Sequence, residues 1–249
     1  MNQQENMLYG IRPLIESIKA GKEIDKVFIQ KGLRGESFAE LYGMLKEFDV
    51  PFQHVPIEKL NRITRKNHQG IIAFVSEISY QPIEEIIPAI YERGETPLII
   101  ILDRITDVRN FGAIARTAEC AGVHAILIPS QGAAQINADA MKTSAGALNN
   151  IPVSRQKNLG QAIDFLRGSG LQVVAATEKA SNFYYSANLN LPTAIIMGSE
   201  EDGVSPAYLK KSDTQVKIPI TGQTGSLNVS VASAIMIYEA VRQRQIPTS

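Results

Sequence analysis

The sequence predicts an α/β protein with a small front domain and a larger domain built on a parallel sheet. From Leu98 onward, short apolar runs alternate with helical patterns, which is typical of a parallel sheet covered by helices on both faces. A separate, shorter set of helical and strand patterns precedes it. The polar stretch 76–82, which ends in proline, favours a connection between the two. We therefore expect a front domain at 1–77, a linker and bridging helix at 78–96, and a second domain at 97–249.

Length and composition allow this division and limit the function. A chain of 249 residues suits two modest domains or one large one, and an apolar content of 44% supports a substantial core. Its formal net charge is zero, so any contact with a nucleic acid requires a local basic patch. Tryptophan is absent and aromatic residues are few, which argues against an extended surface for base stacking.

The cellular compartment is predicted from cysteine use and from the absence of apolar segments long enough to cross a membrane. Cys120 is the single cysteine, so no intramolecular disulfide can form, which fits a reducing cytoplasm. The helical pattern around it predicts a buried side chain. The first ten residues lack the basic and apolar regions of a signal peptide, and the longest apolar runs are of strand length. We expect a cytoplasmic protein without a membrane partner.

In the front domain, a helix is predicted over 8–19, with Gly21 as its stop signal. Ser37 begins the next helix, and Glu40 three residues later predicts a capping box. Pro51 ends that helix. Its inward side chains are expected to be Phe38, Leu41, Leu45 and Phe48. Strands are expected at 26–30, 52–55 and 70–75.

The front domain has one charge feature, the run KLNRITRK at 59–66. Its four basic residues occur without an acid, and they are Lys59, Arg62, Arg65 and Lys66. Such a run is most often a solvated helix face with its loop. In a protein that acts on nucleic acid, the same residues would contact phosphates. The sequence leaves both interpretations open.

In the second domain, strands and helices alternate to the end of the chain. The strands are expected at 97–102, 125–129, 151–153, 171–177, 193–198 and 215–220. The helices are expected at 110–122, 139–143 and 159–167, directly after Pro206, and from 226 to 244.

Three segments at strand ends carry the candidate chemistry: 103–116, 196–206 and 216–244. Ligands of open parallel sheets bind at the carboxyl ends of strands, where each of these segments begins. In the last one, two glycines precede a helix that Ser226, Leu227 and Asn228 open. Glycines let the backbone approach a ligand, and a helix N-terminus adds positive charge. A capped helix after a turn explains the same residues structurally.

Several other sites are disfavoured. No G-x-G-x-x-G follows a first strand, and no Walker A sequence occurs. The histidines at 54, 68 and 124 are isolated, so no metal site is expected. Ser226 has no evident histidine partner, which argues against a hydrolase triad.

Together the three segments resemble the SpoU (TrmH) family of RNA ribose 2′-O-methyltransferases, within the SPOUT superfamily. The matching motifs are N-x-G-A-I-x-R at 110–116, G-S-E-x-x-G at 198–203 and S-L-N-V-S-x-A at 226–232. The segment KTSAGAL at 142–148 is also similar. Val108 stands where the family often has proline. Residues 8–75 resemble the ribosomal-protein-like substrate-binding domain of some members, which favours the ribosomal-RNA branch.

The resemblance implies a fold, a cofactor and an assembly. The fold is a parallel sheet whose C-terminal segment threads a loop, forming a deep trefoil knot. Backbone groups at Gly198, Ile218 and Leu227 are expected to bind S-adenosylmethionine, with no metal. Apolar packing is the alternative role of the last two side chains. The family packs as dimers through the knotted region, so a homodimer is expected.

The resemblance also assigns catalytic roles. Arg116 is the residue that the family implicates in activating the hydroxyl. A guanidinium stays protonated, so we expect it to bind the adjacent phosphate and stabilise the developing alkoxide; a salt-bridged helix arginine is the alternative. Asn110 is expected to position the ribose or Arg116, and Ser226 and Asn228 the substrate and the donor pocket. Glu200 is expected to order its loop by accepting backbone hydrogen bonds.

The predicted function is methylation of a guanosine of 23S rRNA at its ribose 2′-oxygen, with S-adenosylmethionine as donor and RNA as partner. A tRNA guanosine or an rRNA adenosine is an alternative target. A non-catalytic RNA-binding assembly factor is the alternative from another class.

Overall fold

The computed structural model describes residues 7–245, and its chain forms two compact units. The front unit is Met1–Ser79 together with Gln135–Ala138, and the main unit comprises Tyr80–Ala134 and Asp139–Ser249. Residues 1–6, which belong to the segment predicted not to be a signal peptide, lie outside the described residues.

The front unit is a four-stranded mixed sheet with the strand order β1-β4-β2-β3. β4 runs antiparallel to β1 and β2, whereas β2 and β3 are parallel. The strands are β1 Met7–Tyr9, β2 Ile24–Gln30, β3 Phe52–Val55 and β4 Ile71–Val75. The helices are α1 Ile11–Lys19, α2 Glu36–Glu47 and α3 Ile57–Ile63.

The two faces of this sheet differ in their cover, because successive side chains of a strand point to opposite faces. One face packs against α1 and α2 in a core that includes Val27, Ile29 and Leu41. The other carries a smaller cluster made by Phe28, Ile72 and residues of α3. The short helix α3 is therefore the helical cover on the second face.

Local predictions in the front unit need three corrections. The helix predicted over 8–19 begins only at Ile11, because Gly10 (φ 93°) turns the chain between it and the unexpected strand β1. The capping box is wrong: Gly35 is the N-cap of α2 and no side chain caps it, while Glu40 pairs with Lys19 at 3.1 Å. Phe48 follows the helix and is 55% exposed rather than inward.

The main unit is a seven-stranded sheet with the order β7-β6-β5-β10-β8-β11-β9, in which every neighbouring pair is parallel. The fold class predicted from the alternating pattern is confirmed. The strands are β5 Leu98–Leu102, β6 Ala125–Pro129, β7 Val153–Gln156, β8 Gln172–Ala176, β9 Asn182–Phe183, β10 Thr193–Met197 and β11 Thr214–Lys217.

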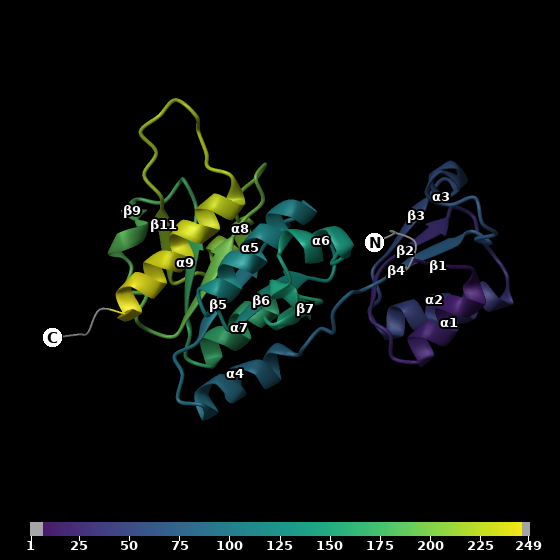
Figure 1. The fold of residues 1–249 in the computed structure, drawn as a ribbon, viewed down its shortest axis with the longest axis horizontal. Coiled ribbons are helices and arrows are strands. Elements are labelled where there is room, and N and C mark those ends of the chain that lie inside the picture. The colour runs from purple at the N-terminus through teal and green to yellow at the C-terminus, as the bar shows by residue number, and fades with distance from the viewer. Residues whose placement is uncertain (1–6, 246–249) are drawn as a thin grey trace. The chain divides into compact units, whose positions relative to one another are not determined.

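Helices cover this sheet, and Figure 1 shows α5 and α9 side by side, apart from α4 and α7. The isoleucines of α4 are buried with α7 and the strands, so α4 belongs to the core of the main unit. The helices are α4 Ile83–Glu92, α5 Val108–Cys120, α6 Ala138–Thr143, α7 Leu159–Gly168, α8 Pro206–Leu209 and α9 Val229–Gln245. Two 3₁₀ turns are η1 Ala147–Asn149 and η2 Tyr184–Ser186.

Several details of the main unit differ from the prediction. β7 covers Val153–Gln156 rather than 151–153, and the two-residue strand β9 was not predicted. β11 ends at Lys217, so 218–220 are not strand, and α9 begins at Val229 rather than at Ser226. The intervening loop extends from the rest of the unit (Figure 1), and residues 219–228 are exposed. Cys120 is exposed, not buried, because it lies on the solvent side of the last turn of α5.

The trefoil knot implied by the resemblance stays a prediction.

Among residues 7–245, no helix combines the length and hydropathy that crossing a bilayer requires.

Arg244 fixes the C-terminal end of α9. Its guanidinium donates hydrogen bonds to four carbonyl oxygens, at Leu189 (3.0 Å), Leu191 (2.9 Å), Thr96 (2.8 Å) and Pro97 (2.9 Å). These acceptors flank the starts of β5 and β10. One side chain therefore satisfies backbone groups of two chain segments that lie far from it in sequence.

We expect Arg244→Met to lower the free energy of unfolding by about 2–4 kcal/mol, because several carbonyls lose a charged donor at once. Urea unfolding measures the loss. Arg93→Met is the control, since within residues 7–245 Arg93 pairs with exposed Glu95 alone, and its free energy of unfolding should stay close to that of the wild type. Equal effects of the two changes would contradict this role of Arg244.

Candidate functional site

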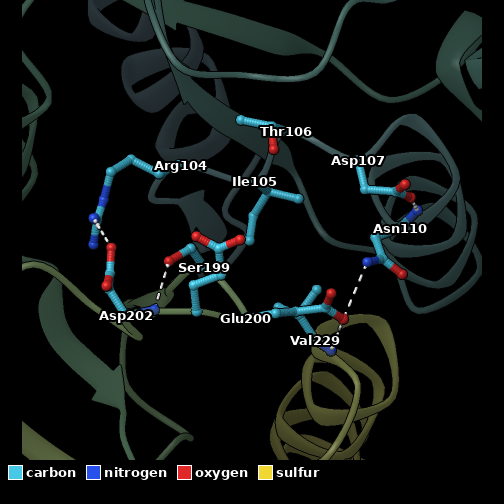
Figure 2. A pocket seen from close by; sticks show the side chains of 10 residues that line it. Arg104, Ile105, Thr106, Asp107, Asn110, Ser199, Glu200, Asp202 and Val229 are labelled. Atoms are coloured by element: carbon cyan, nitrogen blue, oxygen red, sulfur yellow. Dashed lines mark hydrogen bonds and ion pairs between the residues drawn. The ribbon is translucent and has the colours of Figure 1, made fainter.

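The site begins at the carboxyl end of β5, where α5 starts. Asp107 is the N-cap of α5 and accepts a hydrogen bond from the Asn110 backbone N–H at 2.8 Å. Val108 occupies the first helical position, where proline is also favoured, so its replacement of proline leaves the cap intact. The cap holds Asn110 in the first turn, with its side-chain amide turned toward the loop after β10 (Figure 2).

Glu200 joins the three motif segments through a single carboxylate oxygen. Its Oε1 accepts hydrogen bonds from Asn110 Nδ2 (3.2 Å), Asn228 Nδ2 (2.7 Å) and the Val229 backbone N–H (3.4 Å). Asn228 Nδ2 also donates to Asn110 Oδ1 at 3.0 Å, which closes a triangle of three side chains. Figure 2 shows Asn110 and Val229 on either side of the Glu200 carboxylate. We call this group the Glu200 triangle.

Asn228 is also the N-terminal cap of α9. Its Oδ1 accepts from the Ser230 N–H (2.9 Å) and hydroxyl (2.6 Å), and its carbonyl accepts from the Ala232 N–H. The N-termini of α5 and α9 therefore converge on Glu200, where their positive dipole ends favour its negative charge. Asn228 caps the helix as its residue type suggested, while Ser226 lies in the exposed loop before it.

The loop that carries Glu200 closes on itself directly after β10. The Gly203 N–H donates to the Ser199 carbonyl at 2.9 Å, and the two residues form a β-bridge. A Cβ on Gly198 would lie 2.0 Å from the Gly203 carbonyl carbon, which is a severe steric clash for two non-bonded atoms. Gly198 is therefore required because Gly203 of the same loop lies directly against it, while its predicted contact with a ligand stays a prediction.

Asp103 and Arg104 hold the far side of this loop. Buried Asp103 accepts from the Ser205 N–H (2.7 Å) and hydroxyl (2.6 Å). Arg104 donates to Asp103 (3.2 Å), Asp202 (2.9 Å) and the Gly203 carbonyl (3.0 Å). Arg104 does so from a left-handed backbone (φ 59°), which is uncommon outside glycine and costs energy. Sequence reasoning missed both residues; their place at a strand end was the available signal.

Two cavities meet at the Glu200 loop. The larger, about 520 Å³, lies between that loop, the end of β11 and the start of α9; its lining includes Gly198, Ile218, Ile220, Ser226 and Leu227. The smaller, about 270 Å³, is lined on its other side by Arg104, Thr106, Asp107 and Asn110 (Figure 2). Ser199–Asp202 and Val229 line both. The cavities are therefore neighbours with the Glu200 triangle at their boundary.

Two family comparisons cover almost the whole chain. Residues 97–238 match the family described as "SpoU rRNA Methylase family". The chain belongs to this family. Residues 7–81 match the family described as "RNA 2'-O ribose methyltransferase substrate binding". Members of this family are RNA ribose methyltransferases. The predicted reaction class, methylation of an RNA ribose 2′-oxygen, is therefore confirmed.

Named relatives span the same length. YacO of Bacillus subtilis, whose name places it among TrmH family tRNA/rRNA methyltransferases, is 31% identical over 98% of each chain. A similarly named protein of Staphylococcus haemolyticus is 32% identical over 97% of each chain.

Solved structures agree in fold. The SpoU methyltransferase AviRb of Streptomyces viridochromogenes, in complex with AdoMet, is 25% identical, with a TM-score of 0.61 over 96% of this chain and 90% of that one. An AdoMet-bound rRNA methyltransferase of Sinorhizobium meliloti is 26% identical, with a TM-score of 0.61 over 95% and 86%.

The structure brings together most, not all, of the residues predicted for the site of this SpoU family member. The residues that join in the Glu200 triangle or line the larger cavity are Asn110, Gly198, Glu200, Ile218, Ser226, Leu227 and Asn228. Arg116 lines neither cavity. Its side chain is exposed on α5 and makes no hydrogen bond or ion pair within residues 7–245. The salt-bridged alternative for Arg116 is therefore wrong for the described chain.

Glu200 accepts one backbone hydrogen bond, as expected, but two side-chain amides are its nearer partners. Sequence reasoning did not anticipate this direct contact between motifs. Across the described ranges, no group of three or more metal-ligating side chains gathers.

The basic run of the front unit divides between a helix and a loop. Lys59 and Arg62 lie on α3, and Arg65 and Lys66 follow it; all four are exposed. Buried His68 anchors the following loop: its Nδ1 accepts from the Gly70 N–H at 3.0 Å, and its Nε2 faces Asn61 Oδ1 at 2.9 Å. A neutral ring protonated at Nε2 satisfies both contacts.

We expect Gly198→Ala to lower the free energy of unfolding by about 3 kcal/mol, because the added Cβ must push the loop away from β10. Chemical unfolding measures this, with Gly222→Ala as the matched control. A Cβ at Gly222 meets nothing within 4 Å, so that change should stay within about 0.5 kcal/mol. Gly198→Ala with wild-type stability would show that the loop does not close as described.

Proposed function

We propose that this protein transfers a methyl group from S-adenosylmethionine to the ribose 2′-oxygen of a guanosine in 23S rRNA, as a homodimer that packs through a knotted C-terminal region. The observation that carries the proposal is the Glu200 triangle, which ties all three motif segments together at the boundary of two cavities. Family membership and the two AdoMet-bound relatives support the same chemistry.

The larger cavity fits the methyl donor. Its volume lies within the range of small-molecule sites, and Ile218, Ile220 and Leu227 give it apolar cover for an adenine ring. Gly198 and its loop neighbours line this cavity, so their backbone groups are available to the polar edge of a base. We propose Gly198, Ile218 and Leu227 as donor contacts. When bound, S-adenosylmethionine supplies the electrophilic methyl carbon.

The protein's own groups then act on the acceptor ribose. A 2′-hydroxyl is a poor nucleophile, so its placement in line with the methyl carbon supplies much of the rate. The Glu200 triangle fixes the amides of Asn110 and Asn228 at the boundary of the cavities, and we propose that they and Ser226 orient the ribose. Glu200 acts by holding these amides in place.

Arg116 acts through charge in this proposal. It lies six residues beyond Asn110 on α5, about 9 Å along the axis and on a different side of the helix. Arg116 lines neither cavity of its own chain, so we propose that it contacts the acceptor RNA outside those cavities. There it binds the phosphate next to the ribose and stabilises the developing alkoxide. Exposed Val231 and Tyr238 on the neighbouring helix α9 give an apolar surface that supports packing against a second copy.

The proposed RNA target is inferred from the front unit. The front unit matches a substrate-binding family, and its exposed basic residues Lys59, Arg62, Arg65 and Lys66 support phosphate contacts. We propose this unit, over residues 1–77, as the element that selects rRNA. The named relatives include both tRNA and rRNA in their descriptions, so a tRNA guanosine is the second candidate target, beside an rRNA adenosine.

Incubation with isotope-labelled S-adenosylmethionine and unmodified transcripts of 23S rRNA or tRNA tests the reaction. We expect one 2′-O-methylguanosine in 23S rRNA, located by nucleotide-resolution mapping. Methylation of tRNA alone, or of an adenosine, would contradict the proposed target but agree with the proposed reaction. RNA binding without transfer, and without calorimetric affinity for the donor, would favour a non-catalytic assembly factor.

Arg116→Ala should reduce the rate of transfer at least 100-fold while donor affinity stays within about twofold, because the lost charge acts on the acceptor. Single-turnover transfer and donor calorimetry measure the two quantities. Arg167→Ala is the control, since Arg167 lies on α7 and pairs with Asp213 at 2.8 Å. An Arg116→Ala variant with most of its activity would remove Arg116 from the mechanism.

A further inference from the structure

The second face of the front sheet, which α3 partly covers, carries cations that the sequence separates. Lys26 lies on β2 and shares its face with Phe28, since side chains two residues apart in a strand point the same way. Its Nζ lies 5.0 Å from the centre of the Phe28 ring. Lys59 of α3 places its Nζ 4.4 Å from the same ring centre. Two ammonium groups thus share one aromatic ring.

A third cation extends this surface across the sheet. The Nζ of Lys66 lies 5.2 Å from the ring centre of Tyr9 on β1. The strand register aligns Tyr9 with Ile72 and Ile72 with Phe28, so the two rings stand two strands apart, about 10 Å. We call Lys26, Lys59 and Lys66, with the rings beneath them, the basic sheet face.

This face carries positive charge that no carboxylate of the described chain pairs with. Within residues 7–245, none of the three lysines makes an ion pair with a carboxylate. Lys19, on the other side of the same unit, does so with Glu40 at 3.1 Å. Burial, and secondarily the charge of Lys59, lower the pKa of Lys26. Uncompensated cations on a partly apolar surface are complementary to an anion brought from outside.

The neighbouring loop is held in place, so the cations are presented on a fixed frame. The Thr64 hydroxyl accepts from the Lys66 N–H at 3.2 Å, and buried His68 ties the end of the loop to Asn61 and Gly70. Phe28 is buried and therefore cannot stack on a nucleobase. The surface therefore offers positive charge to the phosphates of an RNA backbone, whereas the Phe28 ring is not available to recognise a base.

We propose that Lys26, together with Lys59 and Lys66, forms a binding surface for the phosphate backbone of the RNA substrate. This proposal rests on the proposed function, which supplies RNA as the partner, and it adds Lys26 to a contact region that the sequence confined to 59–66. Binding here is independent of base sequence, so the surface contributes affinity and the choice of nucleotide lies elsewhere.

The test measures RNA binding by the full-length protein as a function of salt. A fluorescently labelled, unmodified 23S rRNA transcript is the probe, with a tRNA transcript in parallel. Lys26→Gln should weaken binding about 3- to 10-fold and lower the slope of log affinity against log salt by about 0.7–0.9, the value for one phosphate contact. Lys26→Gln/Lys59→Gln should lower the slope by about twice that amount, and Lys26→Arg should keep it.

Lys46→Gln is the matched control. Its Nζ lies 4.6 Å from the Tyr42 ring on α2, so it has the same kind of aromatic contact on the opposite side of the sheet. We expect its affinity and salt slope to equal those of the wild type. Unfolding midpoints of all variants exclude a loss of binding through unfolding.

The outcomes separate this inference from the proposed function. Unchanged binding and slope in Lys26→Gln, or an equal loss in Lys46→Gln, would overturn the inference even if the wild type methylates RNA. A wild type that binds RNA with the predicted slopes but transfers no methyl group would overturn the proposed function alone. Normal RNA binding by Lys26→Gln with lost association to ribosomal particles would show that the face contacts a protein instead.

Discussion

One carboxylate oxygen connects the three segments on which the site depends. Glu200 Oε1 receives hydrogen bonds from Asn110 on α5 and from Asn228 and Val229 at the start of α9. Hydrogen bonds to a charged acceptor are stronger than neutral ones, and two helix N-termini add to the local positive potential. Because two segments donate to the same oxygen of the third, a displacement of any one of them disturbs the orientation of the other two.

The Glu200 loop can occupy this place only because two constraints shape it. Gly198 removes the Cβ that would collide with Gly203, and buried Asp103 binds both the backbone and the hydroxyl of Ser205. Arg104 joins Asp103, Asp202 and the Gly203 carbonyl from a strained backbone. Energy is therefore stored at the wall between the two cavities, where strained residues of functional sites are often found.

Charge in the front unit is arranged by face rather than by total. The whole chain is formally neutral, yet Lys26, Lys59 and Lys66 gather on one side of a four-stranded sheet without carboxylate partners within the described chain. Local excess of this kind attracts a polyanion without making the whole protein bind nucleic acid indiscriminately.

The sequence by itself determined the parallel sheet, the order of its main elements and the residue types of the motifs, because burial and chain direction leave periodic patterns. It could not reveal that Glu200 contacts Asn110 and Asn228, which lie 90 and 28 residues away. The exposure of Cys120 and the absence of a capping box at Ser37 were likewise decided by tertiary packing and local backbone geometry. Lys26 had no signature and Arg104 had only its place after a strand end, since their roles depend on loops and faces that only the folded chain brings together. Local sequence patterns specify helices and strands. Contacts between residues distant in sequence arise from how those helices and strands pack, and the site consists of such contacts.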